Sequence, residues 1–149
     1  MKERTGVCNI LNTLLADETL LYLKTRKHHW NVTGKDFSEL HVLFEAQYTE
    51  LELAIDGIAE RIRKLGGNAT ATLKEYISNS RLKEQPGKYP AALVMIEELL
   101  DDQESIIRHL RQDIDKTDKT FHDAVTTDFL TGLMGQHEKM AWMLRSYIS

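Results

Sequence analysis

Two histidines and three carboxylates in the first half of the chain have the donor atoms of a metal site. The histidines are His29 and His41, and the carboxylates are Glu45, Asp56 and Glu60. Imidazole nitrogens suit ferrous iron, and carboxylate oxygens stabilise the harder ferric ion as it forms. These residue types therefore predict a site for iron chemistry.

The spacing of these residues along one helix indicates that a single subunit cannot close the site. At 100° per residue, Glu45, Asp56 and Glu60 lie about 40°, 60° and 100° around the helix from His41. All four share one stripe, yet His41 and Asp56 are about 22 Å apart along the helix axis. An antiparallel copy of the helix, related by a two-fold axis near residue 50, would join the two ends of the stripe. We therefore expect two equivalent sites between subunits, with His29 as a further ligand.

An ordinary polar surface is the alternative interpretation of this stripe. Pairs four residues apart, such as His41 with Glu45, are common on solvated helix faces. The chain also lacks the Glu-x-x-His motif that builds a metal site inside one four-helix bundle. Any metal site is therefore expected at an interface.

Apolar residues at helical spacing predict four long helices and no strand. The first helix spans about residues 6–31, and the second runs from a capping pair, Asp36 with Glu39, to Gly66. The third has Pro90 in its first turn, and the fourth begins near Thr126. The connection over 68–89 contains a short helix at about 73–78 and lets the second and third helices run parallel. The predicted core of the last two helices is Leu93, Ile96, Leu100, Ile107, Leu110, Ile114, Leu130, Leu133, Met140, Leu144 and Tyr147.

The composition favours one all-α domain over residues 1–149, folded as a four-helix bundle. The chain carries 19 Lys and Arg against 23 Asp and Glu, a formal net charge of -4. This balance disfavours general attraction to nucleic acid or to an anionic membrane. No apolar run approaches the roughly 20 residues that span a bilayer, and no signal peptide is evident. Cys8 is the single cysteine, so we expect no internal disulfide and a cytoplasmic protein.

Several residues of the first two predicted helices match the motif of a known family. They are the run His29-Trp30-Asn31, then Gly34, Phe37, Leu40-His41, and Asp56 with Ala59-Glu60-Arg61. These residues closely resemble the motif of the Dps family, the mini-ferritins. The rest of the chain resembles that family only in length and in the pattern of its helices. The resemblance implies a ferritin-like fold and a hollow dodecamer that oxidises Fe²⁺, commonly with H₂O₂ or else with O₂, and stores the ferric product. It also implies that His29, His41 and Glu45 of one subunit bind iron together with Asp56 and Glu60 of another.

One position departs from the family pattern. The family usually has aspartate where this chain has Glu45, and the additional methylene moves the carboxylate outward by about one C–C bond. Occupancy of a second, weaker iron position is therefore in question. His28 is a rival to His29, but only His29 precedes the Trp-Asn pair, and His28 is expected at the surface.

Five further residues are candidates for accessory roles. Trp30 is a candidate electron donor that quenches oxidising equivalents, or else a packing aromatic at the dimer interface. Glu52 lies near the predicted two-fold axis and is a candidate for mineral nucleation. By resemblance, Asp118, Asp123 and Asp128 are candidates for a negatively charged entry pore, with helix-start capping as the alternative.

DNA compaction is a second functional hypothesis, because the family is named for DNA binding. Members that bind DNA generally use flexible, lysine-rich tails, and few residues of this chain are expected outside the helices. A dodecamer of subunits that each carry a net charge of -4 would repel phosphate. A helical bundle that associates without redox chemistry is a third hypothesis.

Overall fold

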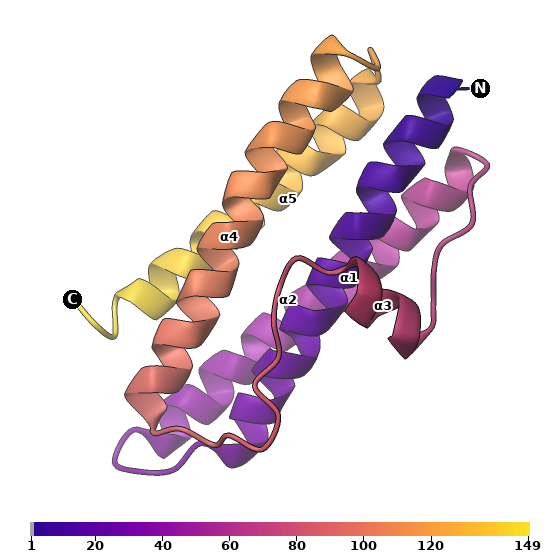
Figure 1. The fold of residues 1–149 in the computed structure, drawn as a ribbon. Helices are drawn as coiled ribbons and strands as arrows, with labels where there is room; N and C mark the ends of the chain where they lie inside the picture. Colours follow the sequence, from indigo (N-terminus) through magenta and orange to yellow (C-terminus); the bar gives the residue numbers. More distant parts are fainter. Residues whose placement is uncertain (1) are drawn as a thin grey trace.

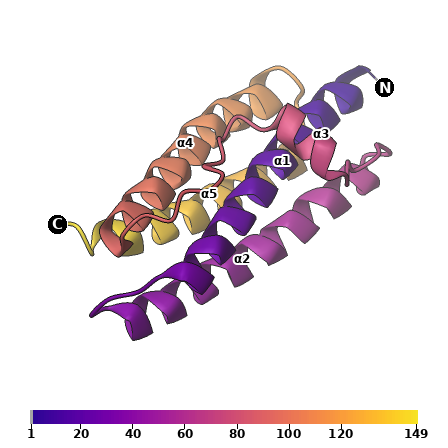
Figure 2. The same cartoon turned by 60° about the horizontal axis from the view of Figure 1, so that its bottom comes forward.

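Four long helices and one short helix build the fold in the computed structural model, which describes residues 2–149. They are α1 (Lys2–Asn31), α2 (Phe37–Lys64), α3 (Leu73–Asn79), α4 (Ala92–Lys119) and α5 (Ala124–Arg145), and residues 2–149 contain no strand. Figure 1 shows two hairpins, α1 with α2 and α4 with α5, packed side by side. The segment 65–91 runs the length of the bundle, so α2 and α4 point in the same direction (Figure 2). The predicted four-helix bundle with a short helix in its long connection is confirmed.

Local sequence signals explain several helix ends. The turn between α1 and α2 contains Gly34 with a φ of 107°, and α2 stops just before Gly66 with a φ of 87°. Glycine adopts this left-handed backbone without a side-chain clash, as the sequence predicted for Gly66. At the start of α3 the Thr72 hydroxyl accepts a hydrogen bond from the backbone N–H of Glu75, which is a capping interaction.

Other predicted helix ends are wrong in detail. Helix α1 already begins at Lys2, and α5 begins at Ala124, two residues before Thr126. Pro90 lies outside α4, because Ala91 takes the N-cap position with an extended backbone. Asp36 does occupy the N-cap of α2, but its side chain makes no capping hydrogen bond.

The apolar core of α4 and α5 follows the predicted stripes with two exceptions. Leu93 is 53% exposed because it lies in the first turn of α4, at the end of the bundle, and Tyr147 is 39% exposed because it follows the end of α5. Ile107 and Ile114 are half-buried against the core. The other predicted positions of α4 and α5 are buried: Ile96, Leu100, Leu110, Leu130, Leu133, Met140 and Leu144. Residues 2–149 include no helix long and apolar enough to cross a membrane.

Polar side-chain pairs join the two hairpins where α1 faces α4. Lys24 pairs with Asp102 at 2.5 Å, and His28 pairs with Glu98 at 3.1 Å. His28 is only 1% exposed, so the prediction that it lies at the surface is wrong. Burial lowers the pKa of His28, against the opposing effect of the Glu98 carboxylate.

A polar layer lies deeper between the hairpins. Glu18 of α1, Gln103 of α4 and His137 of α5 are at most 1% exposed. The His137 Nδ1–H donates to Gln103 Oε1 at 2.6 Å, and its Nε2 forms a hydrogen bond with Glu18 Oε1 at 2.5 Å. These bonds satisfy most of the buried polar atoms in the layer, although Glu18 Oε2 has no hydrogen-bond partner among residues 2–149.

Candidate metal centre

The end of α1 and the start of α2 bring two of the five predicted ligands together. His29 is buried near the end of α1, and His41 is half-buried in the second turn of α2. Their imidazole rings stack with centroids 3.8 Å apart and planes 13° apart. The short turn through Gly34 places the end of α1 beside the start of α2, so the two rings can approach each other.

The backbone determines which ring nitrogen of each imidazole donates a hydrogen bond. His29 Nδ1 lies 2.7 Å from the carbonyl oxygen of His41, and His41 Nδ1 lies 2.8 Å from the carbonyl oxygen of His29. A carbonyl oxygen only accepts, so each Nδ1 carries the proton and donates. In the neutral form of each ring the lone pair therefore lies on Nε2, the atom that binds a metal when Nδ1 donates to a carbonyl.

The three predicted carboxylates lie on α2 and do not reach the histidines within one subunit. Glu45, Asp56 and Glu60 are exposed, and none forms an ion pair or a side-chain hydrogen bond within residues 2–149. The same residues contain no group of three or more His, Cys, Asp or Glu side chains able to hold a metal ion. The five predicted ligands therefore form no complete donor set within one subunit, and a site shared between two copies stays a prediction.

Aromatic rings surround the histidine pair. Phe37 stacks on His41 with ring centroids 5.0 Å apart, and Tyr48 meets His29 edge to face at 5.2 Å. Tyr48 was not among the site residues predicted from the sequence. The sequence feature that could have identified it is its position seven residues after His41, which places it on nearly the same face of α2.

The other candidate residues are dispersed. Trp30 is 61% exposed, and Glu52 and Asp118 are exposed as well. Asp123 caps α5 by accepting from the Thr126 N–H and also pairs with Arg61 at 3.3 Å. Asp128 lines a groove of about 660 Å³ between α2 and α5. Within one subunit these aspartates form no single cluster, so their role in a pore stays a prediction.

Asp123 has the environment of a structural carboxylate. Burial acts to raise its pKa, but hydrogen bonds from Thr126 and the charge of Arg61 outweigh burial, so the pKa of Asp123 is lowered. The helix-capping alternative therefore describes Asp123 in the isolated subunit.

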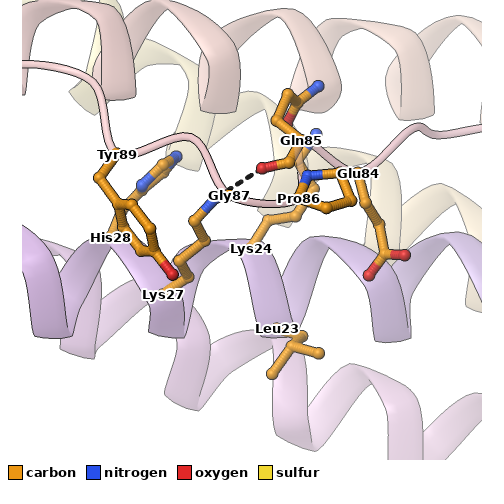
Figure 3. A pocket seen from close by; sticks show the side chains of 9 residues that line it. All are labelled: Leu23, Lys24, Lys27, His28, Glu84, Gln85, Pro86, Gly87 and Tyr89. Carbon is orange, nitrogen blue, oxygen red and sulfur yellow. Dashed lines mark hydrogen bonds between the residues drawn. The ribbon is translucent and has the colours of Figure 1, made fainter.

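A separate pocket of about 380 Å³ lies between α1 and the segment 84–89 (Figure 3). Its lining residues include Lys27 and Tyr89 but none of the five predicted ligands. The Lys27 ammonium already donates to the Gln85 carbonyl oxygen at 3.0 Å and lies 5.1 Å from the Tyr89 ring centre. This pocket is therefore distinct from the candidate metal centre.

Comparisons with known proteins place the chain among the ferritins. The model of the ferritin-like domain matches residues 8–149. DNA protection during starvation protein 2 of Bacillus anthracis is 37% identical over 96% of this chain and 97% of that protein. The chain belongs to the Dps family of the ferritin-like superfamily. An uncharacterized low-temperature-induced protein of Nostoc sp. is 47% identical over 99% of this chain and 82% of its own length.

A solved structure agrees with the Dps assignment. The Dps protein of Vibrio cholerae, described as a member of a broad superfamily of ferritin-like diiron-carboxylate proteins, superposes with a TM-score of 0.93 and 30% identity. The match covers 99% of this chain and 92% of that one. The predicted family and fold are confirmed, while the roles of individual Dps-motif residues in this chain stay predictions.

Proposed function

We propose that this Dps-family protein is a mini-ferritin that binds Fe²⁺ between subunits, oxidises it and stores the ferric product inside a hollow dodecamer. The observation that carries the proposal is the reciprocal bonding of His29 and His41, which leaves two Nε2 lone pairs. The unpaired carboxylates of α2 would supply the oxygen donors that complete an iron site between two subunits.

The shared site follows from placing α2 antiparallel to a second copy of itself. His29, His41 and Glu45 of one subunit would then face Asp56 and Glu60 of its mate, and two-fold symmetry would create the site twice. The histidines hold Fe²⁺, and the carboxylates stabilise the charge that builds up as Fe³⁺ forms. Whether one or two iron ions bind depends on Glu45, whose longer side chain is the departure from the family pattern.

Hydrogen peroxide is the oxidant we propose, with O₂ as the slower alternative. Two Fe²⁺ ions each give one electron to one peroxide, which takes up two protons and becomes two waters. Because the electrons are delivered as a pair, no hydroxyl radical is released. The protein would thereby remove both Fenton reactants, ferrous iron and peroxide, from the cytoplasm.

DNA protection is the alternative function, since the Bacillus anthracis relative is named for it. The net charge of -4 per chain argues against binding through phosphate contacts. A gel-shift assay across salt concentrations tests this alternative, because phosphate contacts weaken steeply as salt rises.

The deciding experiment adds Fe²⁺ anaerobically to the purified protein, then peroxide to one sample and air to another, while ferric absorbance is recorded. We expect rapid oxidation by peroxide at about two Fe²⁺ per H₂O₂, slower oxidation in air, and a soluble product. Oxidation no faster than in buffer, with a ferric precipitate, would mean that the stripe on α2 is an ordinary polar interface.

A further inference from the structure

The pocket between α1 and the segment 84–89 has the size and the lining of a small-molecule site (Figure 3). Its volume of about 380 Å³ falls within the range of ligand-binding cavities. Helix α1 forms one wall, and the turn through Pro86 and Gly87 forms the other. The two walls combine apolar surface with a few polar groups, which is the composition that ligand sites share.

Lys27 provides an uncompensated positive charge in this pocket. Its ammonium donates to the Gln85 carbonyl oxygen at 3.0 Å and lies 5.1 Å from the ring centre of Tyr89. No carboxylate pairs with it among residues 2–149. Because an ammonium has three N–H donors, it still has donors free after the bond to Gln85. Lys27 can therefore bind an anionic oxygen of a ligand through a charge-assisted hydrogen bond.

The other charged groups of the pocket favour a ligand with a single negative charge. Lys24 is already neutralised, because its ammonium pairs with Asp102 at 2.5 Å and donates to the Lys83 carbonyl oxygen at 2.7 Å. Glu84 also lines the pocket and is exposed, with no ion-pair partner within residues 2–149. Its carboxylate repels an incoming anion, and more strongly as the charge of that anion rises.

His28 adds a hydrogen-bonding atom that lacks a partner. The His28 Nε2 atom lies 3.1 Å from Glu98 Oε2, whereas its Nδ1 atom is buried without a hydrogen-bond partner among residues 2–149. A carboxylate only accepts, so in the neutral ring Nε2 carries the proton and Nδ1 is an acceptor. Figure 3 shows the His28 and Lys27 side chains at the Tyr89 end of the pocket. A ligand hydroxyl at this end would satisfy Nδ1.

Apolar side chains supply much of the remaining lining. Leu23 is 46% exposed and Tyr89 is 67% exposed, and Pro86 is exposed as well. Covering these groups with the body of a ligand removes apolar surface from water, which favours binding. An aromatic ring suits the pocket, because its flat face can pack against the proline and the tyrosine ring.

We propose that this pocket binds a small aromatic hydroxy acid. The carboxylate of the ligand binds the Lys27 ammonium, and its ring packs between Pro86 and Tyr89. The ligand hydroxyl donates to Nδ1 of His28. The site is separate from the metal centre, and binding there does not depend on iron oxidation.

The test is a ligand-observed NMR titration of the assembled, iron-free protein with benzoate, 3-hydroxybenzoate, 4-hydroxybenzoate and inorganic phosphate. Iron is left out because hydroxy acids can chelate it. We expect roughly millimolar affinity for the better hydroxybenzoate, in keeping with a ligand of this size. Benzoate should bind more weakly because it lacks the hydroxyl, and phosphate more weakly because it lacks the ring.

Three substitutions assign the binding to this pocket. Lys27→Gln should weaken binding of the better hydroxybenzoate by about tenfold or more, because it removes the charged donor. Lys88→Gln is the matched control, since Lys88 is exposed on the same segment but does not line the pocket. Glu84→Gln should tighten binding, because it removes the opposing charge. This exposed substitution keeps the test decisive if Lys27→Gln fails to fold.

Four outcomes would overturn the proposal. Neither hydroxybenzoate binds, or both Lys27→Gln and Glu84→Gln leave the affinity unchanged. Benzoate or phosphate binds as tightly as the better hydroxybenzoate, which would exclude an aromatic hydroxy acid as the preferred class. Lys88→Gln weakens binding as much as Lys27→Gln does, which would indicate general attraction to surface lysines.

Discussion

His29 and His41 each donate a hydrogen bond from Nδ1 to the backbone carbonyl oxygen of the other, at 2.7 and 2.8 Å. Each histidine therefore orients the other, and the turn between α1 and α2 is closed by the same pair. A carbonyl partner on Nδ1 sets the tautomer that a metal ligand needs and raises the basicity of Nε2. The relationship links the end of α1 to the proposed iron chemistry of α2.

Replacing His41 with alanine should remove one nitrogen donor and release the ring of His29. We expect the rate of Fe²⁺ oxidation by peroxide to fall by at least the roughly 10–100-fold that loss of a supporting partner costs in metal sites. Ferric absorbance at fixed iron gives the rate. His122→Asn is a matched control, because His122 is exposed, has a φ of 51°, and asparagine tolerates that backbone. An unchanged rate in His41→Ala would remove His41 from the site.

A site shared across a two-fold axis should show complementation between two inactive variants. His41→Ala and Asp56→Asn each damage both sites of their own dimer. A mixed dimer contains one intact site, built from His41 of the Asp56→Asn subunit and Asp56 of the His41→Ala subunit. Random co-assembly should therefore recover roughly a quarter of the wild-type oxidation rate. Activity of the co-refolded mixture no greater than that of the separate variants would contradict a shared site.

Glu52 is predicted to act after oxidation. It is exposed on α2 and has no partner within residues 2–149, so Glu52→Gln should fold normally and leave the initial oxidation rate unchanged. Growth of the ferric core, followed by light scattering and electron microscopy after repeated iron additions, should be slower. Glu97→Gln, an exposed substitution on α4, controls for the change in charge. Mineralisation at the wild-type rate would exclude a nucleating role for Glu52.

The bundle could be predicted because the sequence features that specify helices are local. Apolar residues at helical spacing predicted the four long helices, and a glycine predicted where α2 ends. The same periodicity failed at Leu93 and Tyr147, where it cannot tell whether another helix covers that turn. Burial at the end of a bundle depends on where neighbouring helices stop, which is not a local property.

The sequence predicted the identity of some residues of the candidate site but not their contacts or burial. His29 and His41 were selected by residue type, but their reciprocal bonds depend on the turn geometry. His28 was misplaced at the surface because its partner, Glu98, comes 70 residues later. Tyr48 was missed because an aromatic residue at helical spacing has the same pattern whether it packs in a core or beside a ligand.

Asp123→Ala should separate capping from iron entry. Loss of an N-cap costs about 0.5–2 kcal/mol, and each kcal/mol lowers the melting temperature of a domain of this size by about 2–4 °C. Because the folded-state pKa of Asp123 lies below its ordinary value, its stabilisation is complete above that ordinary value and is lost as the pH falls through the folded-state pKa. The difference from wild type should thus shrink in strong acid, as differential scanning calorimetry can measure.

Iron uptake by the same Asp123→Ala protein distinguishes the two roles of this aspartate. A capping residue changes stability and leaves the initial rate of uptake intact, whereas a pore residue slows uptake at neutral pH. Asp118→Ala, at an exposed position of α4, is the comparison. Slower uptake in both variants would support the predicted acidic entry pore.

Replacing one member of the buried Glu18–His137 pair should destabilise the fold more than replacing both with apolar residues. Both side chains are 0% exposed, so Glu18→Leu leaves the Nε2 atom of His137 without a partner. Breaking such a pair costs about 3–5 kcal/mol, whereas replacing both members with apolar residues is often neutral. We therefore expect Glu18→Leu/His137→Leu to unfold at higher urea concentration than Glu18→Leu alone, at equal protein concentration. Glu138→Leu, at an exposed position next to His137, is the control. A double variant no more stable than Glu18→Leu would show that the broken pair is not the source of the lost stability.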